Sequence, residues 1–521
     1  MDKMPFATVI DPPTKRYRPS IRSFTTGLRV RREPLALTGI LIVGAILRFA
    51  LLGRNSIWFD EAVIALVAQF KWQEVFASLR FGDTHPPLYY LLMKTWVHLA
   101  GVGEVALRIP SAFFSLISVV LTYALMRQFS SKRVSLVSAL LVATAPFEIW
   151  SAQMARMYAF LGALTLGATL TLVLSVERRR WGLWGLYAVL TAAMVYTHDL
   201  AFFVLAAHGL WVISYERRHL GRWLLAMGTV AVLYAPWGPS LWYQVTHGPT
   251  WFLGPVLGDK PPYLKLSDLV GLFAFGGSLF GMPSYFFSNT SLTRLEQVLF
   301  LLPFLIVVGS GIALSHGRRQ VALLGLSLAL PVGVMQVVGL WFPAFFARWF
   351  SFLCPFYAML FAGGAFALSR AIRPHSDRIA VYVVSAALLF NIAGLDRYYF
   401  DPQLHPYQWR TAVATLSRKV EPADLLLFGD SGNEATFAYY FKGRAWTRLL
   451  LPGPDLEAIR GLGSRFNRVW LIVAPPANHP AMIDQTLSAL QTSFVLVDGG
   501  ERTLGVYPWV YLFEARSSPR L

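Results

Sequence analysis

Two adjacent acidic residues stand where the first long apolar run ends, in the string Trp58-Phe59-Asp60-Glu61. Carboxylates this close to a membrane are costly to keep and are usually functional. In a half-dry cleft, a carboxylate is well suited to take a proton from an attacking hydroxyl. Asp60 and Glu61 are therefore the first candidates for chemistry, and the alternative is that they only mark the end of a helix in water.

A histidine introduces the next apolar stretch, in Thr84-His85-Pro86-Pro87. The two prolines fix a rigid entry into the helix that follows and present His85 at the interface. A lone histidine is more often structural, but this one lies in the same segment between apolar runs as Asp60. His85 is therefore a candidate substrate contact.

A third polar group surrounds a short predicted turn at 146–150. Glu148 lies in this turn, and Gln153, Arg156 and Tyr158 follow it at helical spacing. Gln153 and Arg156 are three residues apart and can share one helix face. An arginine inside an apolar span needs an anionic partner, and a lipid phosphate or Glu148 could supply it. These four residues are predicted to bind substrate, with an internal Glu148–Arg156 pair as the alternative.

Two further arginines, Arg108 and Arg348, are predicted at the outer ends of other apolar spans. Each is a candidate substrate contact, but each could also reach the lipid headgroups without any catalytic role. The pair His198-Asp199 is predicted to form a short, solvated outer turn, with a secondary polar contact to the site as the alternative.

The elements that must position these residues follow from composition. Of 521 residues, 55% are hydrophobic and 14% are charged, whereas soluble domains carry about 25% charged residues. Several apolar runs reach the length of roughly 20 residues that crosses a hydrocarbon core. The chain is therefore predicted to be a polytopic α-helical membrane protein.

The basic residues predict the topology. Nearly half of the 46 Lys and Arg fall in the N-terminal arm and in alternate short loops, so the net charge of +18 does not indicate nucleic-acid binding. By the positive-inside bias, the cytoplasmic segments are 1–34, 127–133, 178–180, 217–222, 318–319 and 370–378. About eleven spans connect them, near 35–53, 105–127, 133–147, 151–176, 181–197, 200–215, 222–238, 295–315, 320–341, 349–369 and 378–396.

This odd number of spans places the candidate residues and the C-terminal segment outside the cytoplasm. The segments that face outward are 54–104, 146–150, 239–294 and 342–348. The first is rich in aromatic residues and is predicted to form helices along the membrane interface. The third is a candidate lid over the site.

After about residue 398 the sequence alternates between helix-like and strand-like segments, which is typical of a small α/β domain. The helix-like segments are 407–419, 434–441 and 455–459. The strand-like segments are 425–428, 448–451, 469–473, 494–497 and 506–513. We therefore predict a cytoplasmic arm at 1–34, a transmembrane catalytic domain at 35–397 and an extracytoplasmic α/β domain at 398–521.

Three strings resemble glycosyltransferase family 39 of the GT-C superfamily. They are Trp-Phe-Asp-Glu at 58–61, Thr-His-Pro-Pro-Leu-Tyr-Tyr at 84–90 and Leu-Arg-Ile-Pro-Ser-Ala at 107–112. The family includes protein O-mannosyltransferases and the bacterial aminoarabinose transferase that acts on lipid A. The resemblance is specific over 35–180 and looser beyond. It implies a GT-C fold and an inverting transfer of a sugar from a polyprenyl phosphate to a hydroxyl, outside the cell membrane.

By this resemblance Asp60 is the catalytic base and Glu61 its supporting acid, while Arg156 and His85 contact the leaving lipid phosphate. Weaker candidates for the phosphate contact are Arg108 and Arg348. Protein mannosyltransferases continue the His-Pro-Pro-Leu string with Gly-Lys, and aminoarabinose transferases begin it with Lys. This chain does neither, so neither sugar nor acceptor is implied.

The expected partners are membrane lipids, the polyprenyl-phosphate-sugar donor and a hydroxyl acceptor on a lipid, glycan or protein, with no nucleic acid. No cofactor is expected, although a divalent metal at the adjacent carboxylates stays an open alternative. The main rival function is that of a lipid or sugar transporter. Transporters more often show repeated halves with Gly- or Pro-broken spans at matched positions, which this sequence lacks.

Overall fold

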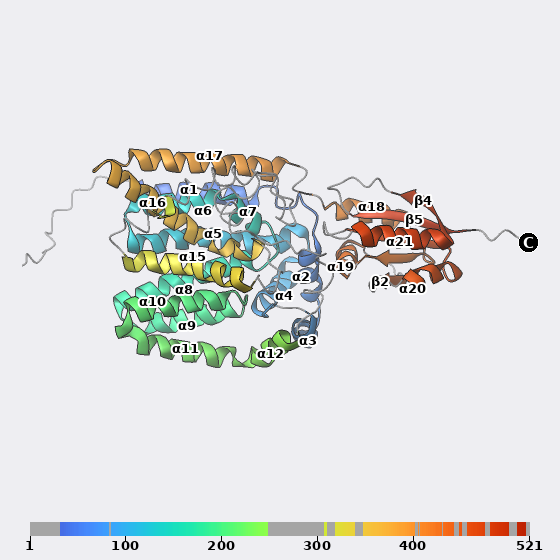
Figure 1. Cartoon of the computed structure of the whole chain (residues 1–521), viewed down its shortest axis with the longest axis horizontal. Coiled ribbons are helices and arrows are strands. Elements are labelled where there is room, and N and C mark those ends of the chain that lie inside the picture. The colour runs from blue at the N-terminus through green and yellow to red at the C-terminus, as the bar shows by residue number, and fades with distance from the viewer. Residues whose placement is uncertain are drawn as a thin grey trace, which may run out of the picture.

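The structure is a computed structural model. It describes residues 32–82, 85–247, 307–309, 318–338, 347–401, 405, 407–429, 431–441, 447–450, 456–474, 480–499 and 508–516. A bundle of helices makes up the larger part, and a unit built on a β-sheet projects from one end of it (Figure 1).

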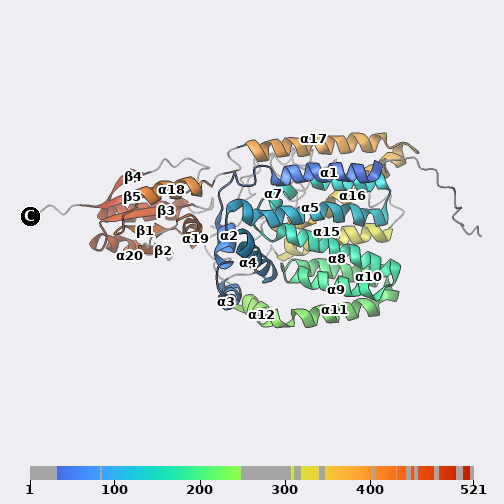
Figure 2. The ribbon, with the colours of Figure 1, turned by 180° about the vertical axis from the view of Figure 1, so that it is seen from behind.

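Apolar helices run side by side along the bundle in both views (Figures 1 and 2). They are α1 (Arg32–Phe49), α5 (Glu104–Phe129), α6 (Lys132–Thr144), α8 (Tyr158–Arg178), α9 (Trp181–Val195), α10 (Ala201–Tyr215), α11 (Leu220–Tyr234), α15 (Arg318–Val338), α16 (Cys354–Ile372) and α17 (Arg378–Phe400).

Among the described helices, six are long and apolar enough to cross a membrane. The number is seven if the bent pair of α6 and α7 (Pro146–Ala152) forms one span. The chain is thus a multi-pass membrane protein. The count of eleven spans stays a prediction, and the span expected at 295–315 lies almost wholly outside the described residues.

Basic turns that are far apart in the sequence meet at one end of the bundle. Arg133 Nη1 lies 2.9 Å from Asp377 Oδ2, which joins the α5–α6 turn to the α16–α17 turn. Arg319, at the start of α15, forms an ion pair with Glu216 at the end of α10. These predicted cytoplasmic segments therefore share the end that lies away from the sheet in Figure 1.

Short helices cover the opposite end. They are α2 (Phe59–Val67), α3 (Trp72–Gly82), α4 (Leu88–Ala100) and α12 (Gly238–His247) (Figure 1). The first three fall in the segment that was predicted to form interfacial helices. With 13 residues, α4 is too short to cross a bilayer. Most of the candidate lid at 239–294 lies outside the described residues.

The C-terminal unit is a five-stranded mixed sheet with helices on both faces. Its elements are α18 (Trp409–Lys419), β1 (Leu425–Phe428), α19 (Ser431–Tyr440), β2 (Thr447–Leu450), α20 (Leu456–Arg460), β3 (Arg468–Val473), α21 (Pro480–Ser493), β4 (Phe494–Gly499) and β5 (Trp509–Ala515). The strand order is β2-β1-β3-β5-β4, with β1 parallel to β2 and β3 and with β5 antiparallel to β3 and β4. The sequence pattern predicted these elements except α21, which it missed.

Candidate active site

Glu61 and Arg108 form a closed pair where α2 meets α5. Arg108 Nε and Nη2 donate to the two carboxylate oxygens of Glu61 at 2.8 and 2.7 Å. The other Arg108 donors reach three backbone carbonyls in 52–56, and the Ala155 N–H donates to Glu61 Oε1 at 2.8 Å. Because all five N–H groups of Arg108 have acceptors, its guanidinium holds the loop before α2 and has no donor left for a lipid phosphate.

Asp60 faces different surroundings from Glu61, since successive residues on an α-helix point about 100° apart. Asp60 Oδ2 is buried, with Arg348 Nη2 at 3.5 Å and Arg156 Nε at 3.7 Å. This oxygen makes no hydrogen bond within the described residues. The Arg348 guanidinium also lies over the Trp58 ring, 5.4 Å from its centroid. Two cations thus lie beside one carboxylate, and guanidinium groups of this kind can also bind an anionic ligand.

A break between α7 and α8 aims Arg156 at this carboxylate. The predicted span at 151–176 was wrong at its start, because residues 153–157 form a turn and α8 begins at Tyr158. Gln153 and Arg156 therefore do not share a helix face. Gln153 Nε2 donates to two carbonyls in the last turn of α1 and to that of Ala50 just beyond it, and its Oε1 accepts from the Tyr398 hydroxyl at 2.9 Å. These contacts assign Gln153 to capping α1 and not to binding substrate.

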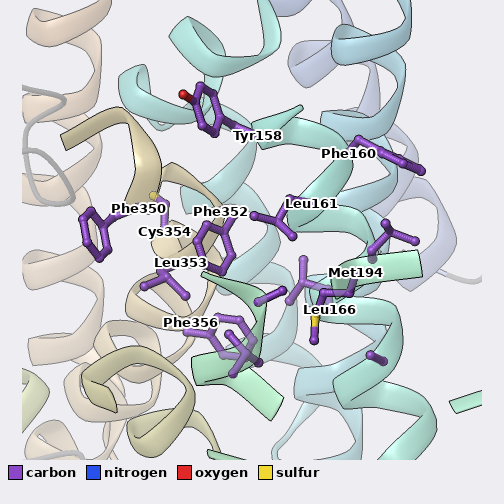
Figure 3. Close-up of a cluster of buried hydrophobic side chains, with 14 of the residues drawn as sticks. Tyr158, Phe160, Leu161, Leu166, Met194, Phe350, Phe352, Leu353, Cys354 and Phe356 are labelled. Carbon is purple, nitrogen blue, oxygen red and sulfur yellow. The ribbon is translucent and has the colours of Figure 1, made fainter. Parts of the chain in front are cut away.

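Apolar packing fixes Arg348, which comes from far along the chain. It lies in a 3₁₀ helix, η6 (Ala347–Leu353), that packs against α8. Figure 3 shows Phe352 beside Leu161 of α8, with Tyr158 at the edge of the same apolar cluster. The Ser351 hydroxyl of η6 also donates to a serine hydroxyl of α7 at 3.3 Å. The position of Arg348 therefore depends on a buried hydrophobic contact.

Glu148 belongs to a contact between helices. The alternative of an internal Glu148–Arg156 pair was wrong, because Arg156 pairs with Asp60. Glu148 Oε2 instead accepts from the Ser115 hydroxyl at 3.4 Å, and Ser115 Oγ accepts from Arg48 Nε at 2.8 Å. Sequence analysis missed Arg48, although a lone arginine inside the apolar run 35–53 signals a need for buried partners.

His85 and Tyr158 each lie near the buried ring of His198. The His198 ring centroid lies 5.3 Å from that of His85, 6.1 Å from that of Tyr158 and 6.4 Å from that of Trp349. His198 is buried, so the prediction of a solvated turn was wrong for this residue. Its Nδ1 accepts a backbone N–H at 3.2 Å. The hydroxyl of Tyr158 is buried and makes no hydrogen bond within the described residues.

The arrangement can accept a proton and hold an anion. Asp60 offers a buried carboxylate oxygen, and Arg156 and Arg348 offer positive charge beside it. In the part of the chain that the structure describes, no three His, Cys, Asp or Glu side chains are grouped to hold a metal ion.

Comparisons with known proteins show which proteins this chain is similar to. A family model described as dolichyl-phosphate-mannose-protein mannosyltransferase matches residues 84–242. Crystal structures of ArnT from Cupriavidus metallidurans are similar in the apo state (TM-score 0.57, 14% identity, 92% of this chain and 97% of that chain covered). The structure of the same ArnT bound to undecaprenyl phosphate is also similar to this chain (TM-score 0.55, 15% identity, 93% of this chain and 98% of that chain covered). The partial family match and the shared fold support the resemblance to the GT-C glycosyltransferases of family 39.

The chain also shares its fold with the Archaeoglobus fulgidus oligosaccharyltransferase tethered with an acceptor peptide. The TM-score is 0.50 at 14% identity, over 94% of this chain and 74% of that chain. A comparison with curated proteins gave no match. The family match begins after Asp60 but contains His85, Arg108 and Arg156. The family match supports the reading of the chain as a glycosyltransferase. The carboxylate–arginine site lies at the end of the bundle that carries the sheet (Figure 1).

Proposed function

We propose that this protein is a glycosyltransferase that moves a sugar, with inversion, from a polyprenyl-phosphate donor to a hydroxyl acceptor at the outer face of the cell membrane. The observation that carries the proposal is the buried Asp60 carboxylate, which faces two arginines. A sugar phosphate already carries a good leaving group. The protein has mainly to orient the acceptor, remove its proton and stabilise the departing phosphate.

In this mechanism Asp60 takes the proton of the acceptor hydroxyl as the hydroxyl oxygen attacks C1 of the sugar. The bond from C1 to the phosphate oxygen breaks on the opposite face, which inverts the configuration at C1. The polyprenyl phosphate leaves with its negative charge next to Arg156 and Arg348. His85, whose ring centroid lies 5.3 Å from that of His198, remains a candidate contact to the same phosphate. Glu61 and Arg108 act by holding α2 in place.

A donor screen tests the proposal. Purified protein is incubated in liposomes with polyprenyl phosphates that carry different labelled sugars, with and without a mixture of envelope lipids as acceptors. Acceptor-dependent loss of sugar from one donor, with release of the polyprenyl phosphate, supports the transferase. Movement of intact donor between leaflets without cleavage supports a flippase and rejects the proposal.

Removing the Arg348 charge is expected to weaken the binding of undecaprenyl phosphate. A charge-assisted hydrogen bond contributes about 1.5–3 kcal/mol, so Arg348→Gln should raise the Kd by at least about tenfold. Binding can be followed by competition with a fluorescent polyprenyl phosphate in detergent. The matched control is Arg397→Gln, since Arg397 pairs with Asp401 in its own helix region. Equal affinities of Arg348→Gln and wild type would remove Arg348 from the phosphate site.

The outer-face location is expected to appear as one-sided cysteine labelling. Ala414 on α18 and Ser131 in a basic turn are both exposed, and each can be changed to Cys after Cys354, which is buried, is changed to Ala. In intact cells a membrane-impermeant maleimide should label Ala414→Cys and reach Ser131→Cys only after permeabilisation. The reverse pattern would invert the topology and place the Asp60 site on the cytoplasmic side.

A further inference from the structure

The loop that leads to the candidate base has little hydrogen bonding of its own. Residues 56–58, between α1 and α2, have no regular secondary structure, and Ile57 and Trp58 are buried. Buried backbone N–H and C=O groups need partners. On the bundle side, Arg108 donates hydrogen bonds to three backbone carbonyls of 52–56. The direction of Asp60 depends on this loop, because α2 begins at Phe59.

The sheet unit holds the same loop from the other side. The Ile57 N–H donates to the Tyr440 hydroxyl at 2.6 Å, and that hydroxyl donates to the carboxylate of Glu104. Arg410 Nε donates to the same carboxylate at 3.1 Å, and Arg410 Nη2 donates to the Gly53 carbonyl at 2.8 Å. One side-chain relay therefore joins α18 and α19 of the sheet unit, the start of α5 and the loop before α2.

The sheet core fixes the two side chains that reach the loop. Trp409 precedes Arg410 and is buried with Phe437, on α19, against Phe428 of β1. Packing at this density leaves α18 and α19 little freedom to move relative to the strands. Tyr440 and Arg410 are thus presented to the loop by a rigid support.

The Tyr440 hydroxyl can keep both of its hydrogen bonds, to Ile57 and to Glu104, at the same time. Burial, followed by the hydrogen bond to Glu104, raises the pKa of Tyr440, so its hydroxyl stays protonated and keeps donating. A tyrosine hydroxyl has one proton to give and lone pairs that accept. Here it gives the proton to Glu104 and accepts from Ile57, which uses both abilities.

We infer that the sheet unit positions the catalytic carboxylate, with Tyr440, held by Glu104 and Arg410, fixing Ile57 and hence the start of the helix that carries Asp60. Tyr440 is a positioning residue and touches no reacting atom. This inference rests on the proposed role of Asp60. If the inference is right, the contact between the sheet unit and the loop affects the turnover rate. If the sheet unit only packs against the bundle, the contact affects the stability of the protein alone.

The experiment compares Tyr440→Phe with Tyr439→Phe in the full-length protein. Both changes remove one hydroxyl from the same helix and the same contact with the bundle. Tyr439 donates to the Val102 carbonyl at 2.5 Å and does not reach the loop. Hydrogen–deuterium exchange of peptides that cover 53–61 reads the link directly, without any substrate. Steady-state kinetics with the donor found by the screen then separates kcat from KM.

Tyr440→Phe removes two hydrogen bonds, of which the one accepted from Ile57 holds the loop directly, and loss of a neutral hydrogen bond changes an equilibrium by about tenfold. In Tyr440→Phe, exchange in 53–61 should be about fivefold faster, and kcat should fall by about fivefold to tenfold at unchanged donor KM. Tyr439→Phe should match wild type in both readouts. Unchanged exchange in Tyr440→Phe overturns the link, and faster exchange with an unchanged kcat overturns its part in turnover. Absence of transfer by wild type would instead reject the proposed function, while the exchange result would still decide the link.

Discussion

Asp60→Asn is expected to abolish sugar transfer while undecaprenyl phosphate binds at least as tightly as it does to wild type. The amide keeps the shape of the carboxylate but cannot take the proton of the acceptor, and loss of a general base costs about 10²–10⁴ in rate. The same change removes the anion that faces Arg156 and Arg348, so a phosphate meets less repulsion there. The measurements are turnover of the labelled donor and the Kd of undecaprenyl phosphate.

The opposite responses of rate and affinity separate a base from a structural residue. Were Asp60 only to hold the two arginines in place, both turnover and phosphate affinity would fall. Asp377→Asn is the matched control, because Asp377 forms ion pairs at the basic end of the bundle, away from the site. Near-wild-type turnover in Asp60→Asn would assign the proton acceptor to another group.

Breaking the Glu61–Arg108 pair is expected to destabilise the protein more than any surface change. Both side chains are almost fully buried. Removing one partner leaves an uncompensated buried charge, which typically costs about 3–5 kcal/mol. Glu61→Gln and Arg108→Gln should each lower the melting temperature of the detergent-solubilised protein strongly, as followed by intrinsic fluorescence.

A double variant gives the internal check. Glu61→Gln combined with Arg108→Gln leaves no lone charge, so it should be less destabilised than the sum of the two single changes. Lys419→Ala serves as the surface control, since Lys419 and Asp498 are each about half exposed and such pairs contribute about 0–1 kcal/mol. A single Glu61 variant as stable as the Lys419 control would show that the pair does not hold α2 to α5.

The sequence by itself determined the class of protein and most of its elements. Apolar runs of membrane-crossing length predict helices, because the backbone must satisfy its hydrogen bonds within the segment in lipid. The continuous apolar strand Leu425–Phe428 was predictable because a parallel strand covered on both faces has no polar side. Asp60 could also be singled out as a candidate for chemistry, since a carboxylate beside an apolar run is rare enough to stand out without any knowledge of its partners.

Only the tertiary structure decided which charges pair. Sequence spacing suggested that Gln153 shares a helix face with Arg156, and it left an internal Glu148–Arg156 pair open as an alternative, but the break at 153–157 turns these side chains in different directions. The partners of Asp60 come from the α7–α8 turn and from η6, and η6 is placed by apolar packing on α8. Tyr440 reaches the loop before Asp60 from a different folding unit. Such contacts join residues far apart in the chain, and local patterns carry no information about them because packing of whole helices sets their distances.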